Sequence, residues 1–220
     1  MATVTTATEL SQGEHRFVIR DVGWEGYQAL LKIIGNQPVR LTYDGGNVEL
    51  MSPLPIHERR RTRLGRTVQI LTEELLVPVM PMGSTTWGRE DLDKGLEADE
   101  SFYLGDLERV GDPDNVKLDV DPPPDLAIEI EITRSALYRL GIYGALGVPE
   151  IWRYNGRELK VLLRQDDGSY RLSASSSAFP DVPMAEIERF VNMEGFRNEN
   201  EWARQFRDWV RAEVLPRSPG

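Results

Sequence analysis

The segment PPPDLAIEIEIT at residues 122–133 constrains the fold more than any other part of this sequence. Every second residue is a large aliphatic one, at Leu126, Ile128, Ile130 and Ile132. The positions that alternate with them hold three acids and one alanine: Asp125, Ala127, Glu129 and Glu131. A period of two predicts a β-strand with one apolar face and one acidic face.

The spacing of the acids shows which of them can act together. At a rise of about 3.3 Å per residue, Glu129 and Glu131 lie ~6.6 Å apart on one face, whereas Asp125 is ~13 Å from Glu129. Only the two glutamates can converge on one small object, and Asp125 is expected in a turn or cap. Two interpretations of the pair stay open: a solvated outer face of a half-buried strand, or a metal or catalytic site.

Length and hydrophobic content predict one packed domain with appendages. The 220 residues are 40% hydrophobic, which suffices for a single sizeable core. We expect a flexible N-terminal arm at 1–15, a domain at 16–193, and a C-terminal helix and tail at 194–220.

Residue usage excludes several kinds of site. There is no cysteine and there are two histidines, so disulfides and thiolate metal sites are excluded, while oxygen-liking ions such as Mg²⁺ remain. The sequence has no GxGxxG, no GK[ST] phosphate loop and no GxSxG. It also has no apolar run near 18 residues and no basic-then-apolar leader, so we expect a cytoplasmic protein without a membrane partner.

The charge distribution gives an ambiguous signal about nucleic acid. A net charge of −10 opposes general adhesion to DNA, but residues 57–66, HERRRTRLGR, hold five arginines against one glutamate. We expect this run on the outward face of a helix, where Arg59, Arg60 and Arg63 are candidate DNA contacts. A merely solvated helix face is the commoner meaning of such a run.

Hydrophobic spacing and turn residues predict the order of elements, which indicates an α/β or α+β sheet flanked by helices. We expect a turn at Lys94-Gly95. Thr133 or Ser135 is expected to cap the helix that follows the acidic strand. Four aromatic residues are expected in the core: Trp87, Tyr138, Tyr143 and Trp152. The predicted elements are a helix within 23–38, a hairpin over 40–51, a helix over 57–76, strands at 84–87 and 96–104, a polar loop at 105–121, the acidic strand, a helix at 134–147, a meander over 150–174, and helices near 184–193 and 199–214.

Asp99 stands at the start of the strand expected to precede the acidic strand. An Asp on one strand and a Glu on its neighbour can share a divalent ion, and Glu131 can complete or tune such a site. Glu49, in the predicted hairpin, can face the same place or take a surface cross-strand role.

Several segments, in order, resemble one known family. GLEADESFYL, PPPDLAIEIEIT, IYGALGVPEIWRYNG and DGGNVELMSPLPIH are similar to motifs of the Uma-two family of endonucleases, in the PD-(D/E)xK, restriction-endonuclease-like superfamily. The resemblance covers roughly residues 17–192.

The resemblance implies a restriction-endonuclease-like core, with a central mixed β-sheet flanked by helices. The helices predicted from hydrophobic spacing near the C-terminus would form a C-terminal helical extension of this core. It implies Mg²⁺ or Mn²⁺ as cofactor and hydrolysis of DNA phosphodiester bonds. Asp99 and Glu129 match the metal-binding acids, with the peptide carbonyl of Ile130 as a third ligand. His57 matches a family histidine near the site, although a surface position at the helix start is an alternative.

The sequence departs from the superfamily pattern at the lysine. Glu131 stands two residues after Glu129, and Arg139 occupies the position on the next helix where similar chains carry lysine. Arginine can stabilise a transition state but cannot deprotonate water, so Glu131 or a metal-bound hydroxide would act as base. Arg139 can instead be a salt-bridge partner of Glu131.

Three functions therefore stay open. The leading hypothesis is a metal-dependent DNA endonuclease, in which the arginine run or a homodimer supplies the DNA-contacting face. A non-catalytic binding or assembly module and a metal-dependent phosphoesterase acting on small nucleotides are the alternatives.

Overall fold

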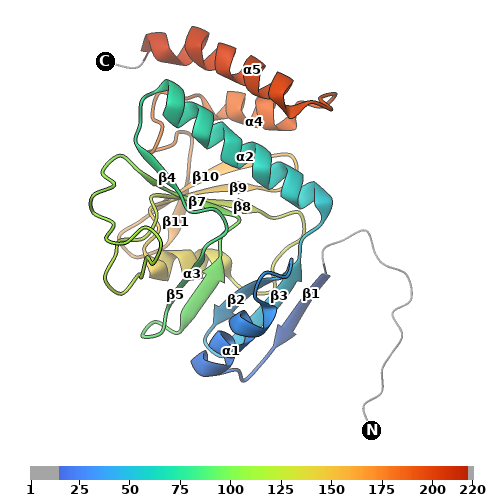
Figure 1. The fold of residues 1–220 in the computed structure, drawn as a ribbon, viewed down its shortest axis with the longest axis vertical. Coiled ribbons are helices and arrows are strands. Elements are labelled where there is room, and N and C mark those ends of the chain that lie inside the picture. The colour runs from blue at the N-terminus through green and yellow to red at the C-terminus, as the bar shows by residue number, and fades with distance from the viewer. Residues whose placement is uncertain (1–14, 218–220) are drawn as a thin grey trace.

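The computed structural model describes residues 15–217, which form two β-sheets with helices on both sides (Figure 1). Residues 1–14 of the predicted N-terminal arm, and residues 218–220, lie outside the described residues. No helix in the described range is both long enough and apolar enough to cross a membrane.

The first sheet is antiparallel and is built around the predicted hairpin. Gly45 and Gly46 form its turn with φ of +50° and +84°, a conformation that glycine adopts without steric cost. Its strands, in spatial order, are β1 (His15–Ile19), β3 (Asn47–Ser52), β2 (Arg40–Asp44), β6 (Lys94–Glu97) and β5 (Thr86–Arg89).

The second sheet is mixed and contains the acidic strand in its interior. Strand β8 pairs antiparallel with β7 and parallel with β9, and all five of its residues are buried. Its strands, in spatial order, are β11 (Tyr170–Ser173), β10 (Leu159–Arg164), β9 (Glu150–Tyr154), β8 (Leu126–Ile130), β7 (Glu100–Leu104) and β4 (Val79–Pro81).

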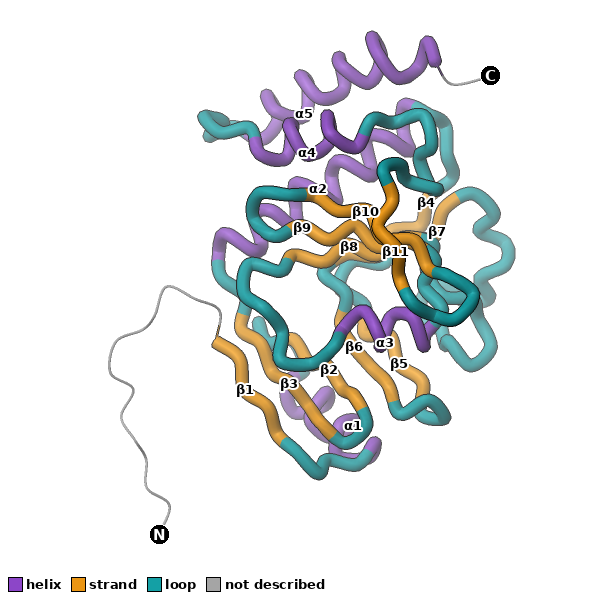
Figure 2. Tube along the Cα trace, turned by 180° about the vertical axis from the view of Figure 1, so that it is seen from behind, coloured by secondary structure: helices purple, strands orange, loops and turns teal. Residues whose placement is uncertain are grey.

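The helices cover three separate faces. Helices α2, α4 and α5 stack on one side of the second sheet, α3 lies on its other side against β5 and β6, and α1 packs on the first sheet (Figures 1 and 2). They are α1 (Trp24–Ile34), α2 (Pro55–Glu74), α3 (Arg139–Leu146), α4 (Met184–Asn192) and α5 (Glu199–Trp209), which continues as a π-helix at Val210–Val214 and a 3₁₀ turn at Leu215–Arg217.

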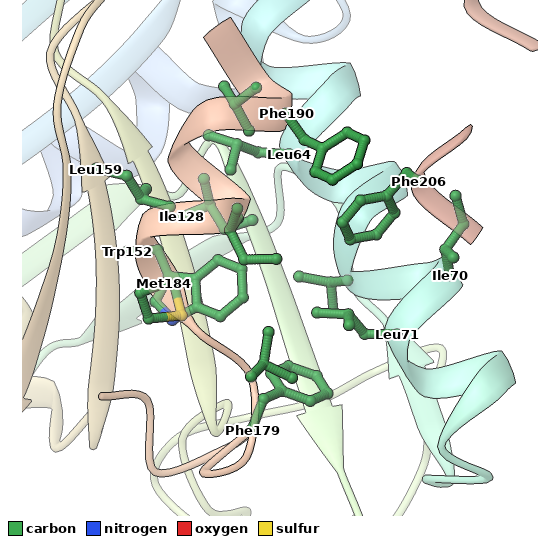
Figure 3. Close-up of a cluster of buried hydrophobic side chains, with 14 of the residues drawn as sticks. Leu64, Ile70, Leu71, Ile128, Trp152, Leu159, Phe179, Met184, Phe190 and Phe206 are labelled. Carbon is green, nitrogen blue, oxygen red and sulfur yellow. The ribbon is translucent and has the colours of Figure 1, made fainter. Parts of the chain in front are cut away.

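The two faces of β8 enter different cores, which explains the alternation in its sequence. Leu126, Ile128 and Ile130 pack beneath α2 and the C-terminal helices, in the cluster shown in Figure 3 around Trp152 and Phe206. Ala127 belongs to the cluster around α3. The predicted class, a central mixed sheet flanked by helices with a C-terminal helical extension, is confirmed, although the strands divide into two sheets.

Several local predictions were wrong. Lys94 and Gly95 lie inside β6, and the segment expected as one strand at 96–104 is split between β6 and β7, which belong to different sheets. Helix α3 begins at Arg139 rather than near residue 134, because Ser135 and Thr133 bond to other partners instead of capping it. Tyr138 is 67% exposed, whereas the other three aromatics expected in the core are buried.

Candidate active site at the junction of the two sheets

A pocket of about 740 Å³ lies where the end of β8, the loop leading to α3, and strands β1 and β3 meet. Figure 2 shows that loop running from β8 toward α3 beside the first sheet. Asp99, Glu129 and Ile130 line the pocket together with Glu131 and Arg139. Five of the residues predicted as catalytic or metal-binding thus line one cavity, and the sixth, His57, does not line it.

Asp99 occupies the link between β6 and β7, which is the crossing point from one sheet to the other. It is 2% exposed, and its Oδ2 accepts a 2.6 Å hydrogen bond from the peptide N–H of Ile130. This bond fixes the carboxylate against the end of β8.

Two basic side chains hold Asp99 from behind. His57 of α2, fully buried, places Nε2 at 3.3 Å from Oδ2, and Arg40 of β2 places Nε at 3.3 Å from Oδ1. Burial acts to raise the pKa of Asp99, but the hydrogen bond and charge of His57, with Arg40 and Arg139, lower it below the ordinary value. Asp99 is therefore ionised at neutral pH.

Glu129 is held by a bidentate arginine. Its carboxylate accepts hydrogen bonds of 2.8 and 2.6 Å from Nε and Nη2 of Arg139, and a further one from the hydroxyl of Tyr143. Glu129 is only 6% exposed, and burial raises its pKa even though Arg139 acts in the opposite direction.

Arg139 joins the site to the first sheet. Its guanidinium also donates to the hydroxyl of Thr42 on β2 and, at 2.8 Å, to the carbonyl of Glu97 on β6. Burial opposes its charge, but the neighbouring Glu129 raises the pKa of Arg139 above the ordinary value. Arg139 is thus a permanent cation and cannot serve as a base.

The predicted pairing of Arg139 with Glu131 is wrong. Glu131 instead lies 3.4 Å from Arg153 of β9, and both side chains are partly exposed at the pocket. Glu131 follows the last residue of β8, so it projects at the pocket edge while Glu129 lies deeper.

Glu49 has the expected cross-strand contact, with Arg16 of β1, but it is buried rather than on the surface. It is 1% exposed, and it binds Arg16 at 2.6 Å, the Ser135 hydroxyl at 2.8 Å and the Ala136 peptide N–H at 2.5 Å. The carboxylate therefore anchors the loop between β8 and α3 to the hairpin. Asp125 has a similar structural role, because it accepts a 2.7 Å bond from the peptide N–H of Leu104.

The arginine run on α2 does not form the expected outward face. Arg63 is 2% exposed and donates to the carbonyls of Val191 and Met193, while Arg60 donates to Val191 at 2.5 Å. Arg59 alone of the three candidates is exposed. These contacts attach α2 to the C-terminal segment, so Arg60 and Arg63 do not present a surface to DNA.

The donor atoms at the pocket fit a hard divalent cation. Within residues 15–217, no three or more His, Cys, Asp or Glu side chains are grouped to hold a metal ion, so any site must combine Asp99 and Glu129 with backbone oxygen and water. Mg²⁺ needs only one or two carboxylates because it keeps several waters.

One buried oxygen at the site has an ion pair but no hydrogen bond, because Arg40 Nε lies 3.3 Å from Asp99 Oδ1. In the described part of the chain, Asp99 Oδ1 is buried and accepts no hydrogen bond. Glu129 Oε2 carries the single bond from Arg139, although a carboxylate oxygen has two lone pairs. The residues can therefore bind the metal ion if the carboxylate of Glu129 contacts the ion and Arg139 at the same time.

Comparison with known proteins identifies the family. A family model described as "Putative restriction endonuclease", Uma2, matches residues 24–192. The chain belongs to the Uma2 family. The resemblance predicted from the sequence motifs is thus confirmed, and a nuclease-like function follows in general terms. Restriction-endonuclease-like proteins typically use a divalent metal. Among curated proteins, no sequence matches this Uma2 chain.

Sequence reasoning missed two side chains that hold the acids. Arg40 supports Asp99 and Thr42 supports Arg139, and both lie on β2. They are two residues apart, so they share one face of the strand, as alternation along 40–44 indicates. Nothing in the sequence around β2 identifies the side chains that Arg40 and Thr42 contact, because these lie roughly 60 to 100 residues further along the chain.

Proposed function

We propose that this Uma2 chain is a metal-dependent DNA endonuclease that hydrolyses phosphodiester bonds at Asp99 and Glu129. The observation that carries the proposal is the meeting of these two buried carboxylates, one from the link before β7 and one from β8, at one open pocket. Membership of a restriction-endonuclease family supports the reaction class.

Asp99, Glu129 and the carbonyl of Ile130 would hold Mg²⁺ or Mn²⁺. Bound there, the ion would polarise the phosphate and lower the pKa of an attacking water. His57 and Arg40 keep Asp99 ionised and oriented, and both act through that carboxylate rather than on substrate.

Arg139 and Glu131 have different tasks in this proposal. Arg139 orients Glu129 and presents fixed positive charge to the scissile phosphate, where a guanidinium stabilises charge that develops in the transition state. Glu131, partly exposed at the pocket, is the carboxylate positioned to accept the proton of water. A homodimer would align two such pockets on one DNA molecule.

One observation favours a second candidate function. Arg139 occupies both oxygens of Glu129, and a structural ion pair of this kind would also suit a non-catalytic binding or assembly module. A phosphoesterase acting on small nucleotides has no such specific support.

Nicking of supercoiled plasmid in the presence of Mg²⁺ or Mn²⁺ tests the leading proposal. We expect the parent protein to nick DNA and to lose this activity in EDTA. Glu129→Gln and Asp99→Asn should lose nicking by a large factor, because each removes a charged metal ligand. Titration calorimetry with Mn²⁺ should show weak binding by the parent and none by Glu129→Gln.

Glu150→Gln is the matched control for folding damage. Glu150 is a fully buried carboxylate that bonds to Trp152 and to the Ser176–Ala178 segment, outside the pocket. It should nick DNA at the parental rate at temperatures where it is folded. A parent that nicks no DNA with either metal, or a fully active Glu129→Gln variant, would refute the endonuclease proposal.

A further inference from the structure

The acid pair lies at the floor of the pocket rather than on an open surface. Asp99 and Glu129 are 2% and 6% exposed, and the pocket above them has a volume of about 740 Å³. Cavities of about 300–1,000 Å³ enclose most of a small ligand. The backbone of an intact DNA duplex that touches the pocket rim would stay outside the pocket and away from the acids, whereas a single unstacked nucleotide can enter it.

An exposed aromatic residue stands at the rim. Tyr138 lines the pocket and is 67% exposed, although a tyrosine ring is commonly buried. Its ring lies against Gly141, where an added Cβ would be 2.6 Å from the ring atom Cδ1. Glycine at 141 therefore lets the ring rest on the first turn of α3 while most of it remains in solvent.

A free cation lines the same pocket as this ring. Arg134 lines the same pocket and is exposed, and within the described residues its guanidinium forms no hydrogen bond or ion pair. The loop that carries both side chains is tied down by Glu49 through Ser135 and Ala136. The ring and the cation are thus presented on a fixed support.

The pocket differs in charge from the rest of the molecule. Its lining contains four arginines and three carboxylates, a net of +1, whereas the whole chain carries −10. Repulsion of DNA should therefore be weaker at this mouth than the net charge of the whole chain suggests.

We propose that the pocket binds one unpaired nucleotide of a DNA strand, with the base stacked on Tyr138 and a flanking phosphate bound by Arg134. This inference rests on the proposed function and specifies its substrate as single-stranded or locally opened DNA rather than intact duplex. Enzymes with recessed sites reach a nucleotide in this way, because a base inside the stack cannot enter them. Stacking on an aromatic ring tolerates any base, so the site requires no particular sequence.

Binding without metal tests the proposal independently of cleavage. Fluorescence anisotropy in EDTA would compare a short labelled oligothymidine with a blunt duplex of equal length, and the parent should bind the single strand more tightly. Tyr138→Ala should weaken single-strand binding by about 5- to 100-fold, and Tyr138→Phe should retain the parental affinity. Arg134→Ala should reduce the slope of log affinity against log salt by about 0.7, the value for one phosphate contact on a single strand.

Arg204→Ala serves as the matched control. Arg204 is exposed on α5, away from the pocket, so its removal should leave affinity and slope unchanged. Tyr138 and Arg134 are both exposed, and melting temperatures should confirm that their variants fold. The proposal is overturned if the duplex binds as tightly as the single strand, if no single strand binds, or if Tyr138→Ala keeps the parental affinity.

The two proposals can fail separately. If Tyr138 and Arg134 govern single-strand binding but the parent nicks no DNA with Mg²⁺ or Mn²⁺, the nucleotide site stands and the endonuclease proposal fails. If the parent nicks DNA while neither variant changes binding, the nucleotide site fails and the endonuclease proposal stands.

Discussion

Removal of Arg139 should destabilise this fold strongly. Arg139→Ala deletes four hydrogen bonds, two to Glu129, one to Thr42 and one to the carbonyl of Glu97. Glu129 would remain 6% exposed beside Tyr143, without its cation. The variant therefore leaves a charged group in the interior.

The cost follows from the desolvation of that carboxylate. Breaking a buried ion pair by removing one partner costs about 3–5 kcal/mol, because the remaining charge is uncompensated. At roughly 2–4 °C per kcal/mol for a chain of this size, the melting temperature should fall by about 6–20 °C. Arg153→Ala is the matched control: its pair with Glu131 is partly exposed, and such pairs contribute about 0–1 kcal/mol.

The loss of stability caused by Arg139→Ala should depend on pH. Burial already raises the pKa of Glu129, and loss of Arg139 should raise it further. A carboxyl group with a raised folded-state pKa contributes its full stability below its unfolded pKa and loses it as pH rises through the folded pKa. The difference between Arg139→Ala and the parent should therefore be large at neutral pH and smaller near pH ~4.5.

Urea titrations followed by circular dichroism, in EDTA and at both pH values, would measure these differences. A double variant with Met at 139 and Leu at 129 should recover part of the loss, since it buries no charge. The reasoning is wrong if Arg139→Ala costs no more than Arg153→Ala, or if its penalty is the same at both pH values.

Three further predictions concern other buried polar contacts. Arg63→Ala should lower the free energy of unfolding by about 3 kcal/mol or more, because it leaves two carbonyls of the C-terminal segment unpaired. Arg59→Ala, at an exposed position, should lower it by less than about 0.5 kcal/mol. Equal melting temperatures of the two variants would contradict this prediction. Glu150→Gln should cost about 1–3 kcal/mol in urea titrations, since it disrupts the bonds that hold the Ser176–Ala178 segment, and a parental midpoint would contradict it. The hydrogen bond from His57 and contacts with arginines lower the pKa of Glu58 to about 2, so its contribution is present above its ordinary pKa of 4.5 and is lost as pH falls through about 2. Glu58→Gln should therefore flatten the fall in stability between about pH 5 and pH 2, and an unchanged slope would exclude this contribution.

Periodicity and turn chemistry predicted most of the elements because those signals are local. The hairpin over 40–51 and the helix over 57–76 depend on spacings of two, three and four residues, and both are present with nearly the expected bounds. The division into two sheets was not predicted. Asp99 lies at the crossing between them, and an alternating run gives no sign of which sheet each half will join.

The partners of charged side chains were the least predictable part of the site. The five arginines at 59–66 have the composition of a solvated helix face, yet the buried Arg63 fills a place made by Val191, Met193 and Glu199. Those partners are more than 120 residues away in sequence. Whether a charge faces solvent or a buried set of acceptors depends on tertiary contacts that a single sequence does not reveal.

Arg139, where the sequence resemblance led us to expect a lysine, affects both shape and charge at the pocket. A lysine at this position would offer one ammonium group with three donors, which could not span Glu129 on β8 and the acceptors on β2 and β6 with the geometry of a guanidinium. Arginine satisfies both carboxylate oxygens with one edge and reaches Thr42 and the carbonyl of Glu97 with its remaining donors. It therefore crosslinks the two sheets at the point where the acids meet. Because the same contacts join the two sheets and neutralise Glu129, any change at 139 should alter both stability and the proposed metal binding, which a change confined to catalysis would not do.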